Sequence, residues 1–166
     1  MNWSVPVLSL MLVAGVLPAT AWPHRAAPNH REALVLSDTL PGRVVQGTHE
    51  HGGLRRAWRL YLPQSRRNDT APALLVMLHG CTQDAADLVR GTRVEAHAER
   101  AGLLVLVPEQ PASAHPQKCW NWYDPRHQAR GGGEVALLSS LITEVMSAYG
   151  VDAARLMPRI VPVPTL

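Results

Sequence analysis

The residues His79-Gly80-Cys81 place an imidazole and a thiol directly after an apolar run of the chain. The run Ala73–Leu78 contains six apolar residues, which suits a strand buried on both faces better than a half-exposed one. We therefore expect an inner strand of a mostly parallel sheet. His79 to Cys81 then lie where that strand ends and a loop with free backbone N–H groups begins. Chemistry at this point would use these N–H donors or the His79 imidazole.

Two further stretches could hold an ion or a cofactor, and neither carries a complete pattern. His49-Glu50-His51 offers two imidazoles and a carboxylate, but such side chains at a hairpin tip are more often solvated than bound to a metal. Gly131 to Gly133 could cradle a phosphate, yet the Gly-Lys-Ser/Thr that completes a P-loop is missing. We therefore expect no metal and no cofactor at either place.

The first 21 residues have the pattern of an export signal. Val5–Leu17 is an apolar segment that is too short to span a bilayer comfortably, and Ala19-Thr20-Ala21 is a small-residue cleavage site. No Lys or Arg precedes the apolar segment, so an uncut N-terminal anchor stays open as the alternative. We predict a signal peptide at 1–21, a Pro-, His- and Ala-rich mobile leader at 22–31, and a secreted or periplasmic protein without membrane association after cleavage.

Cys81 and Cys119 are the only cysteines of the chain. Neither has the spacing of a metal-binding knuckle, and an exported chain meets an oxidising compartment that favours disulfides. A bond between them would close a loop of about forty residues, which stabilises by roughly 4 kcal/mol in the chain-entropy model. It would also tie the loop Trp120-Asn121-Trp122 to the end of the Ala73–Leu78 strand.

The elements that position these residues follow from the apolar periodicity. Strand, helix and strand over 73–107 form a βαβ unit, whose crossover makes the two strands parallel. The loop 111–133 is long, and its aromatic residues and the predicted disulfide indicate an ordered, functional segment. We expect edge strands at 32–37, 43–46 and 56–62, with a turn at Gly52-Gly53 between the last two. Helices are expected at 84–88 and 93–100, and a strand at 103–107. The last element is a helix at 134–149, whose apolar stripe is Val135, Leu138, Ile142, Val145 and Tyr149.

The composition describes one folded domain. The chain has 166 residues, of which 46% are apolar, enough to fill a single core. Its formal net charge of +3 comes mostly from arginines scattered singly along the sequence. Without a basic stripe or an aromatic platform, we expect no nucleic-acid binding.

Four motifs in order resemble a known family: Leu78–Asp84, Val107–Gln110, Cys119–Asp124 and Arg130–Glu134. Together they are similar to the secreted poly(3-hydroxybutyrate) depolymerase-type esterases, over roughly residues 59–156. Feruloyl and acetylxylan esterases share parts of the pattern. The resemblance implies a three-layer α/β-hydrolase fold and a Ser-His-Asp triad that cleaves carboxylic esters through an acyl-enzyme, with no cofactor and an ester or polyester as substrate.

The resemblance also implies roles for individual residues. The backbone N–H of Cys81 would stand in the oxyanion hole, where one such donor contributes about 3 kcal/mol in the transition state. His79 would shape the loop and not act as the general base, because the triad histidine comes last in this fold. Trp120, Asn121 and Trp122 would line or buttress the acyl side of the cleft, and plain core packing is an equally open role for each tryptophan.

The sequence departs from the family after Leu156. Family members continue into a central strand and a Gly-x-Ser-x-Gly elbow, whereas residues 157–166 contain three prolines, which makes a central strand implausible. No serine of the chain lies in an elbow pattern. We therefore expect a partial catalytic domain at 32–156, truncated before the nucleophile strand, and an aberrant tail at 157–166 produced by a frameshift.

Two functions follow from this departure. One is a serine esterase portion that lacks the triad and is inactive alone, with the Ala73–Leu78 strand left as an open sheet edge. The other is a non-catalytic exported protein that uses the Trp120 loop to bind a polymer or a partner.

Overall fold

The computed structural model describes residues 33–36, 40–65 and 70–160. The predicted signal peptide at 1–21 and the leader at 22–31 lie outside these residues, as do the last six residues of the predicted tail. The described strands form one sheet in the order β1-β2-β3-β5-β4-β6. Their bounds are β1 Ala33–Leu36, β2 Arg43–His51, β3 Leu54–Leu62, β4 Leu74–Leu78, β5 Leu104–Glu109 and β6 Leu156–Ile160.

The sheet is mixed. Strands β4, β5 and β6 run parallel to one another, as the βαβ pattern predicts, while β1, β2 and β3 join in antiparallel pairs and β3 also pairs antiparallel with β5. The expectation of a mostly parallel sheet therefore holds only for the β5-β4-β6 part of the described sheet. The α/β class and the βαβ unit are confirmed.

The hairpin β2–β3 is longer than the sequence predicts. Its turn is Gly52-Gly53, and both glycines have positive φ, 58° and 76°, which two-residue turns between twisted strands require. Strand β2 continues to His51 because every residue from Arg43 onward finds a partner in β3. Strand β3 is also an inner strand and not an edge strand, since β5 lies on its other side.

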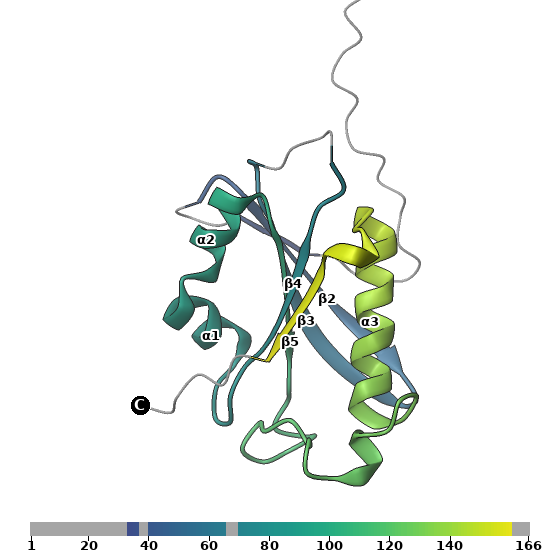
Figure 1. Ribbon diagram of the computed structural model, residues 1–166. Coiled ribbons are helices and arrows are strands. Elements are labelled where there is room, and N and C mark those ends of the chain that lie inside the picture. The colour runs from purple at the N-terminus through teal and green to yellow at the C-terminus, as the bar shows by residue number, and fades with distance from the viewer. Residues whose placement is uncertain (1–32, 37–39, 66–69, 161–166) are drawn as a thin grey trace, which may run out of the picture.

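Helices cover both faces of the sheet, which gives three layers (Figure 1). Helices α1, Ala85–Thr92, and α2, Val94–Ala101, lie on one face, and α3, Gly133–Tyr149, lies on the other. Two short 3-10 helices, η1 at Pro125–His127 and η2 at Ala153–Arg155, flank α3 along the chain. Among the described residues, no helix combines the length and apolarity needed to cross a bilayer.

The side chains of each inner strand alternate between two apolar clusters. Val76 and Leu106 pack in the cluster beneath α3, together with Leu141 of that helix. Met77 and its neighbours on the opposite face pack in the cluster beneath α1 and α2, which includes the fully buried Leu88. This burial on both faces is what the continuous apolar runs of β4 and β5 predict.

The predicted apolar stripe of α3 is confirmed only in its C-terminal half, where Val145 is buried in the core and Ile142 and Tyr149 pack against it. The residues buried against the sheet are Leu137, Leu141 and Val145, while Ile142 and Tyr149 are only partly buried beside them. Of the predicted stripe, Val135 and Leu138 instead line a pocket described below. The error arises because α3 is apolar around most of its circumference, so periodicity alone does not select one face.

The sequence argument against a central strand after Leu156 does not exclude the edge strand that the structure contains there. Strand β6 pairs in parallel with β4 over its whole length, and Pro158 stands opposite Val76. Because β6 is an edge strand of the described sheet, a residue without an N–H can be accommodated there. The expectation that β4 is an open edge is therefore wrong as well, since β5 and β6 flank it.

Candidate functional site

The turn that follows β4 leaves one backbone donor without an acceptor in the described part of the chain. The Gly80 N–H donates to Gln83 Oε1 at 3.0 Å, the Thr82 N–H to the Gln117 carbonyl at 2.6 Å, and the Gln83 N–H to the Gly80 carbonyl at 3.3 Å. Thr82 has a positive φ of 63°, which closes the turn. Within the described ranges, no acceptor is found for the N–H of Cys81. This N–H is therefore the donor that the turn can offer to a ligand.

His79 is buried and shapes this turn. Its Nε2 accepts a hydrogen bond from the Gln110 N–H at 3.0 Å, so the ring proton of the neutral imidazole lies on Nδ1, which is 2.9 Å from the Gly80 carbonyl. Both ring nitrogens are thus occupied by backbone groups. This arrangement fits the predicted loop-shaping role and leaves neither nitrogen available to act as a general base.

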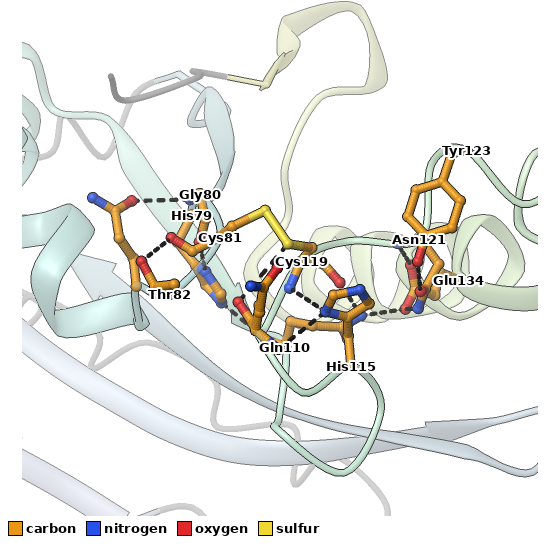
Figure 2. The surroundings of a disulfide bond; sticks show 12 residues. His79, Gly80, Cys81, Thr82, Gln110, His115, Cys119, Asn121, Tyr123 and Glu134 are labelled. Atoms are coloured by element: carbon orange, nitrogen blue, oxygen red, sulfur yellow. Dashed lines mark hydrogen bonds between the residues drawn. A yellow bond between two sulfur atoms is a disulfide. The ribbon is translucent and has the colours of Figure 1, made fainter. Parts of the chain in front are cut away.

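Cys81 and Cys119 form the predicted disulfide, with Cα atoms 4.3 Å apart (Figure 2). The bond joins the turn after β4 to the loop between β5 and α3. Since Cys81 is itself exposed, the bond ties an exposed turn to a half-buried aromatic loop. The position of the Cys81 N–H therefore depends on the position of Cys119.

A pocket of about 320 Å³ adjoins the turn. Leu78, Val135 and Leu138 supply apolar walls from β4 and α3, and two tryptophans of the loop complete them. Cys81 and His79 lie on the lining as well. The available donor thus borders an apolar pocket.

The predicted loop residues have three different surroundings. Trp120 is half-buried, with its ring tilted against the His79 ring at a centroid distance of 5.8 Å. Trp122 is 74% exposed and stands edge-on to Tyr123, which is 54% exposed. Both tryptophans line the pocket. Asn121 buttresses the loop, because its backbone N–H and its side-chain Nδ2 both donate to Glu134, at 2.8 and 2.9 Å.

Glu134 is the centre of a buried polar network that sequence reasoning missed (Figure 2). Besides the two donors of Asn121, its carboxylate accepts from Arg56 Nη2 at 2.9 Å and from Gln110 Nε2 at 2.5 Å. Burial by itself would raise the pKa of Glu134, but the hydrogen bonds from Asn121, Gln110 and Arg56 outweigh it and hold the pKa below its usual value. The carboxylate is therefore ionised and paired with the buried Arg56 guanidinium.

The sequence contained only part of the signal for this network. Gln110 and Glu134 lie inside motifs that carry the family resemblance, and Glu134 follows three glycines, which suggests only the start of a helix. Arg56 stands in a doublet with Arg55 that resembles a solvated pair. Its partner is 78 residues away along the chain, so local sequence does not reveal the contact.

The His49 region is also not as predicted. His49 is buried rather than solvated, and its Nδ1 lies 2.7 Å from the Glu144 carboxylate of α3. Strand β2 runs past this residue to His51, which moves His49 from the hairpin tip into the sheet. Among the described residues, no group of three or more His, Cys, Asp or Glu side chains is placed to hold a metal ion.

The comparison with protein families decides the identity of the domain. The model of the family "Esterase PHB depolymerase" matches residues 56–159. The chain belongs to this family. The match includes most of β6, so the family resemblance continues past Leu156, where the sequence analysis predicts that it ends.

Two curated relatives of the chain are named as a depolymerase and an esterase. The chain is 30% identical over 82 residues to poly(3-hydroxyalkanoate) depolymerase C of Paucimonas lemoignei, covering 49% of this chain and 20% of the relative. It is 30% identical over 98 residues to feruloyl esterase B of Neurospora crassa, covering 58% and 32%. The chain therefore spans between a fifth and a third of the length of these two curated relatives.

Solved structures show the same fold. The acetyl xylan esterase from Aspergillus awamori superposes with a TM-score of 0.55 at 19% identity, over 78% of this chain and 41% of that one. The described residues thus have part of the α/β fold of this solved structure, as the motifs imply.

Proposed function

We propose that this chain forms part of a secreted serine esterase that hydrolyses short-chain polyhydroxyalkanoates or similar carboxylic esters. The observation that carries the proposal is the Cys81 N–H, which has no acceptor in the described part of the chain and borders an apolar pocket in a member of this family. The disulfide supports export, because such bonds persist in oxidising compartments.

The chemistry assigned to the turn is stabilisation of an oxyanion. When a nucleophile attacks an ester carbonyl, negative charge develops on the carbonyl oxygen, and a fixed N–H donor there stabilises the transition state by about 3 kcal/mol. Cys81 is restrained on its side-chain side by the disulfide and on its backbone side by the turn. Its N–H therefore needs little reorganisation during the reaction.

The pocket favours an acyl group of modest size. Most of its walls are aliphatic and aromatic side chains, with His127 and Glu134 also on the lining, and about 320 Å³ accommodates a short acyl chain. The relative named poly(3-hydroxyalkanoate) depolymerase fits this chemistry, since hydroxyalkanoate units are short and largely apolar. Trp120 and Trp122 are assigned to substrate contact, and Asn121 to holding their loop.

We expect the chain of residues 1–166 to hydrolyse a chromogenic butyrate ester no faster than buffer does. It has no Gly-x-Ser-x-Gly sequence, and oxyanion donors without a nucleophile and base leave only residual catalysis. The measurement is absorbance of the released chromophore, with heat-denatured chain as the control. Turnover that a serine-directed phosphonate abolishes would contradict the proposed absence of a triad.

The exposure of Trp122 favours a second candidate function, the binding of a polymer surface without turnover. We expect Trp122→Ala to lower adsorption of the chain to polyhydroxybutyrate granules several-fold, while the free energy of unfolding changes by no more than about 0.5 kcal/mol. Met157→Ala is the matched control, because Met157 is also an exposed apolar side chain but lies outside the loop. Equal adsorption of both variants would exclude the loop as the binding surface.

A further inference from the structure

Gln110 makes hydrogen bonds to three segments of the proposed site, through His79, Cys119 and Glu134. It follows the last residue of β5 and is completely buried. Figure 2 shows its side chain between the Cys119 backbone and the network around Glu134. Neither the family motifs nor the pocket assigns it a role.

The orientation of the Gln110 amide is determined by its partners. Nε2 donates to the Cys119 carbonyl at 2.9 Å and to Glu134 Oε1 at 2.5 Å, and both partners are acceptors, so the nitrogen must face them. The other amide atom, Oε1, is buried and has no hydrogen-bond partner among the described residues. A buried acceptor without a partner disfavours the folded state. We therefore look for the role of Gln110 in the two groups that its Nε2 binds rather than in a gain of stability.

Gln110 restrains the turn after β4 from two sides. Through its backbone, its N–H fixes His79, whose other ring nitrogen contacts the Gly80 carbonyl. Through its side chain, it fixes the Cys119 carbonyl, and Cys119 is covalently bound to Cys81. Glu134 in turn holds the amide in place.

We propose that Gln110 is a positioning residue for the Cys81 donor, acting through the carbonyl and the disulfide of Cys119. It touches no substrate. The inference rests on the proposed function, in which the Cys81 N–H stabilises the oxyanion.

The experiment records amide and imidazole NMR spectra of the isotope-labelled chain and titrates it with butyrate, a carboxylate that can accept from the Cys81 N–H. Gln110→Met removes both side-chain donors and keeps the length of the side chain. We expect the Cys81 amide signal to move and the affinity for butyrate to fall about ten- to a hundredfold, the range for one misplaced hydrogen bond to a charged acceptor. The His79 ring signals should not move, because the backbone N–H that binds Nε2 remains.

Gln128→Met is the matched control. Gln128 also donates one side-chain hydrogen bond to a loop carbonyl, that of Trp122, but it is exposed and has no link to Cys119. In Gln128→Met, the Cys81 amide signal and the affinity for butyrate should match those of the unmodified chain.

Three results would overturn the inference. A folded Gln110→Met variant with an unmoved Cys81 amide shows that the side chain does not position the donor. If Gln110→Met does not fold, Gln110→Asn replaces it, because asparagine keeps the amide but has a side chain one carbon shorter. An unmoved Cys81 amide signal in Gln110→Asn would also show that the Gln110 side chain does not position the donor. An unfolded Gln110→Asn variant would show that the residue is needed for the fold itself. Lack of butyrate binding by the unmodified chain contradicts the proposed function only, because the movement of the Cys81 amide is measured without butyrate.

Discussion

Replacing Glu134 by leucine is expected to lower the free energy of unfolding by about 3–5 kcal/mol, the usual cost of breaking a buried ion pair from one side. The change leaves the Arg56 guanidinium buried, with the Arg55 carbonyl as its remaining partner among the described residues and its Nε already unpartnered. It also removes the Glu134 acceptor of Asn121 and one of the two acceptors of Gln110. Urea unfolding followed by tryptophan fluorescence measures the loss.

The reverse change, Arg56→Met, should cost less. Glu134 then keeps the donors of Asn121 and Gln110, so its charge stays solvated by hydrogen bonds. The double variant should be more stable than the sum of the two single changes predicts, because no lone charge remains buried. Arg55→Met is the matched control: Arg55 pairs with Glu50 on the surface, both side chains are about two-thirds exposed, and such pairs contribute about 0–1 kcal/mol. Equal losses for Arg55→Met and Arg56→Met would contradict the assignment.

Acid should weaken the same network. The pKa of Glu134 is lowered in the folded state, so its stabilising effect is fully present above the unfolded-state pKa of a glutamate, about 4.3, and is lost as the pH falls through the lower folded-state value. The difference in unfolding free energy between the unmodified chain and Glu134→Gln should therefore shrink between about pH 7 and pH 3. A constant difference over this range would show that the carboxylate is not ionised in the folded chain.

Removing the disulfide should cost nearly as much, roughly 4 kcal/mol for a bond between cysteines 38 residues apart. We expect the double change Cys81→Ser and Cys119→Ser to shift the urea midpoint down, and dithiothreitol to shift the unmodified chain by a similar amount. Because the chain has no other cysteine, the double serine variant is also the control for the reductant and should not respond to it. A reductant effect on that variant, or none on the unmodified chain, would show that the bond does not stabilise the fold.

The sequence predicts the inner part of the fold well. Strands β4 and β5 and the parallel crossover between them follow from apolar runs and helix signals, and the hairpin turn follows from Gly52-Gly53. The pairing of the disulfide could be predicted because the chain has only two cysteines. Each of these signals is local, or involves a choice among very few residues.

What could not be predicted depends on contacts between distant segments. The buried partners of Arg56 and His49 lie on α3, far along the chain, and an arginine doublet or a histidine near a turn looks solvated until that helix packs. Strand β6 was missed because proline propensity argues against a strand, while pairing with β4 overrides propensity at an edge. At the candidate site, sequence motifs identify the Cys81 turn and the tryptophans, but not the hydrogen bonds of Gln110 that connect them.

The alternation of β5 between two apolar clusters has a consequence for strand register. Leucines 104 and 106 face α3 and valines 105 and 107 face α1 and α2, so both faces are apolar and differ only in side-chain volume. Within residues 104–107, sliding β5 by one residue would only exchange large for small apolar groups, so polarity selects the register of this apolar run weakly. Polarity acts at the end of the strand, because a slide would carry Glu109 into the buried place of Pro108 or of Gln110. Further selection comes from outside the strand: the tight turn fixes β2 against β3, and β3 aligned with β5 places Arg56 where it can meet Glu134. The buried ion pair between Arg56 and Glu134 thus helps to fix the register of β3 and β5, which side-chain size alone would specify poorly.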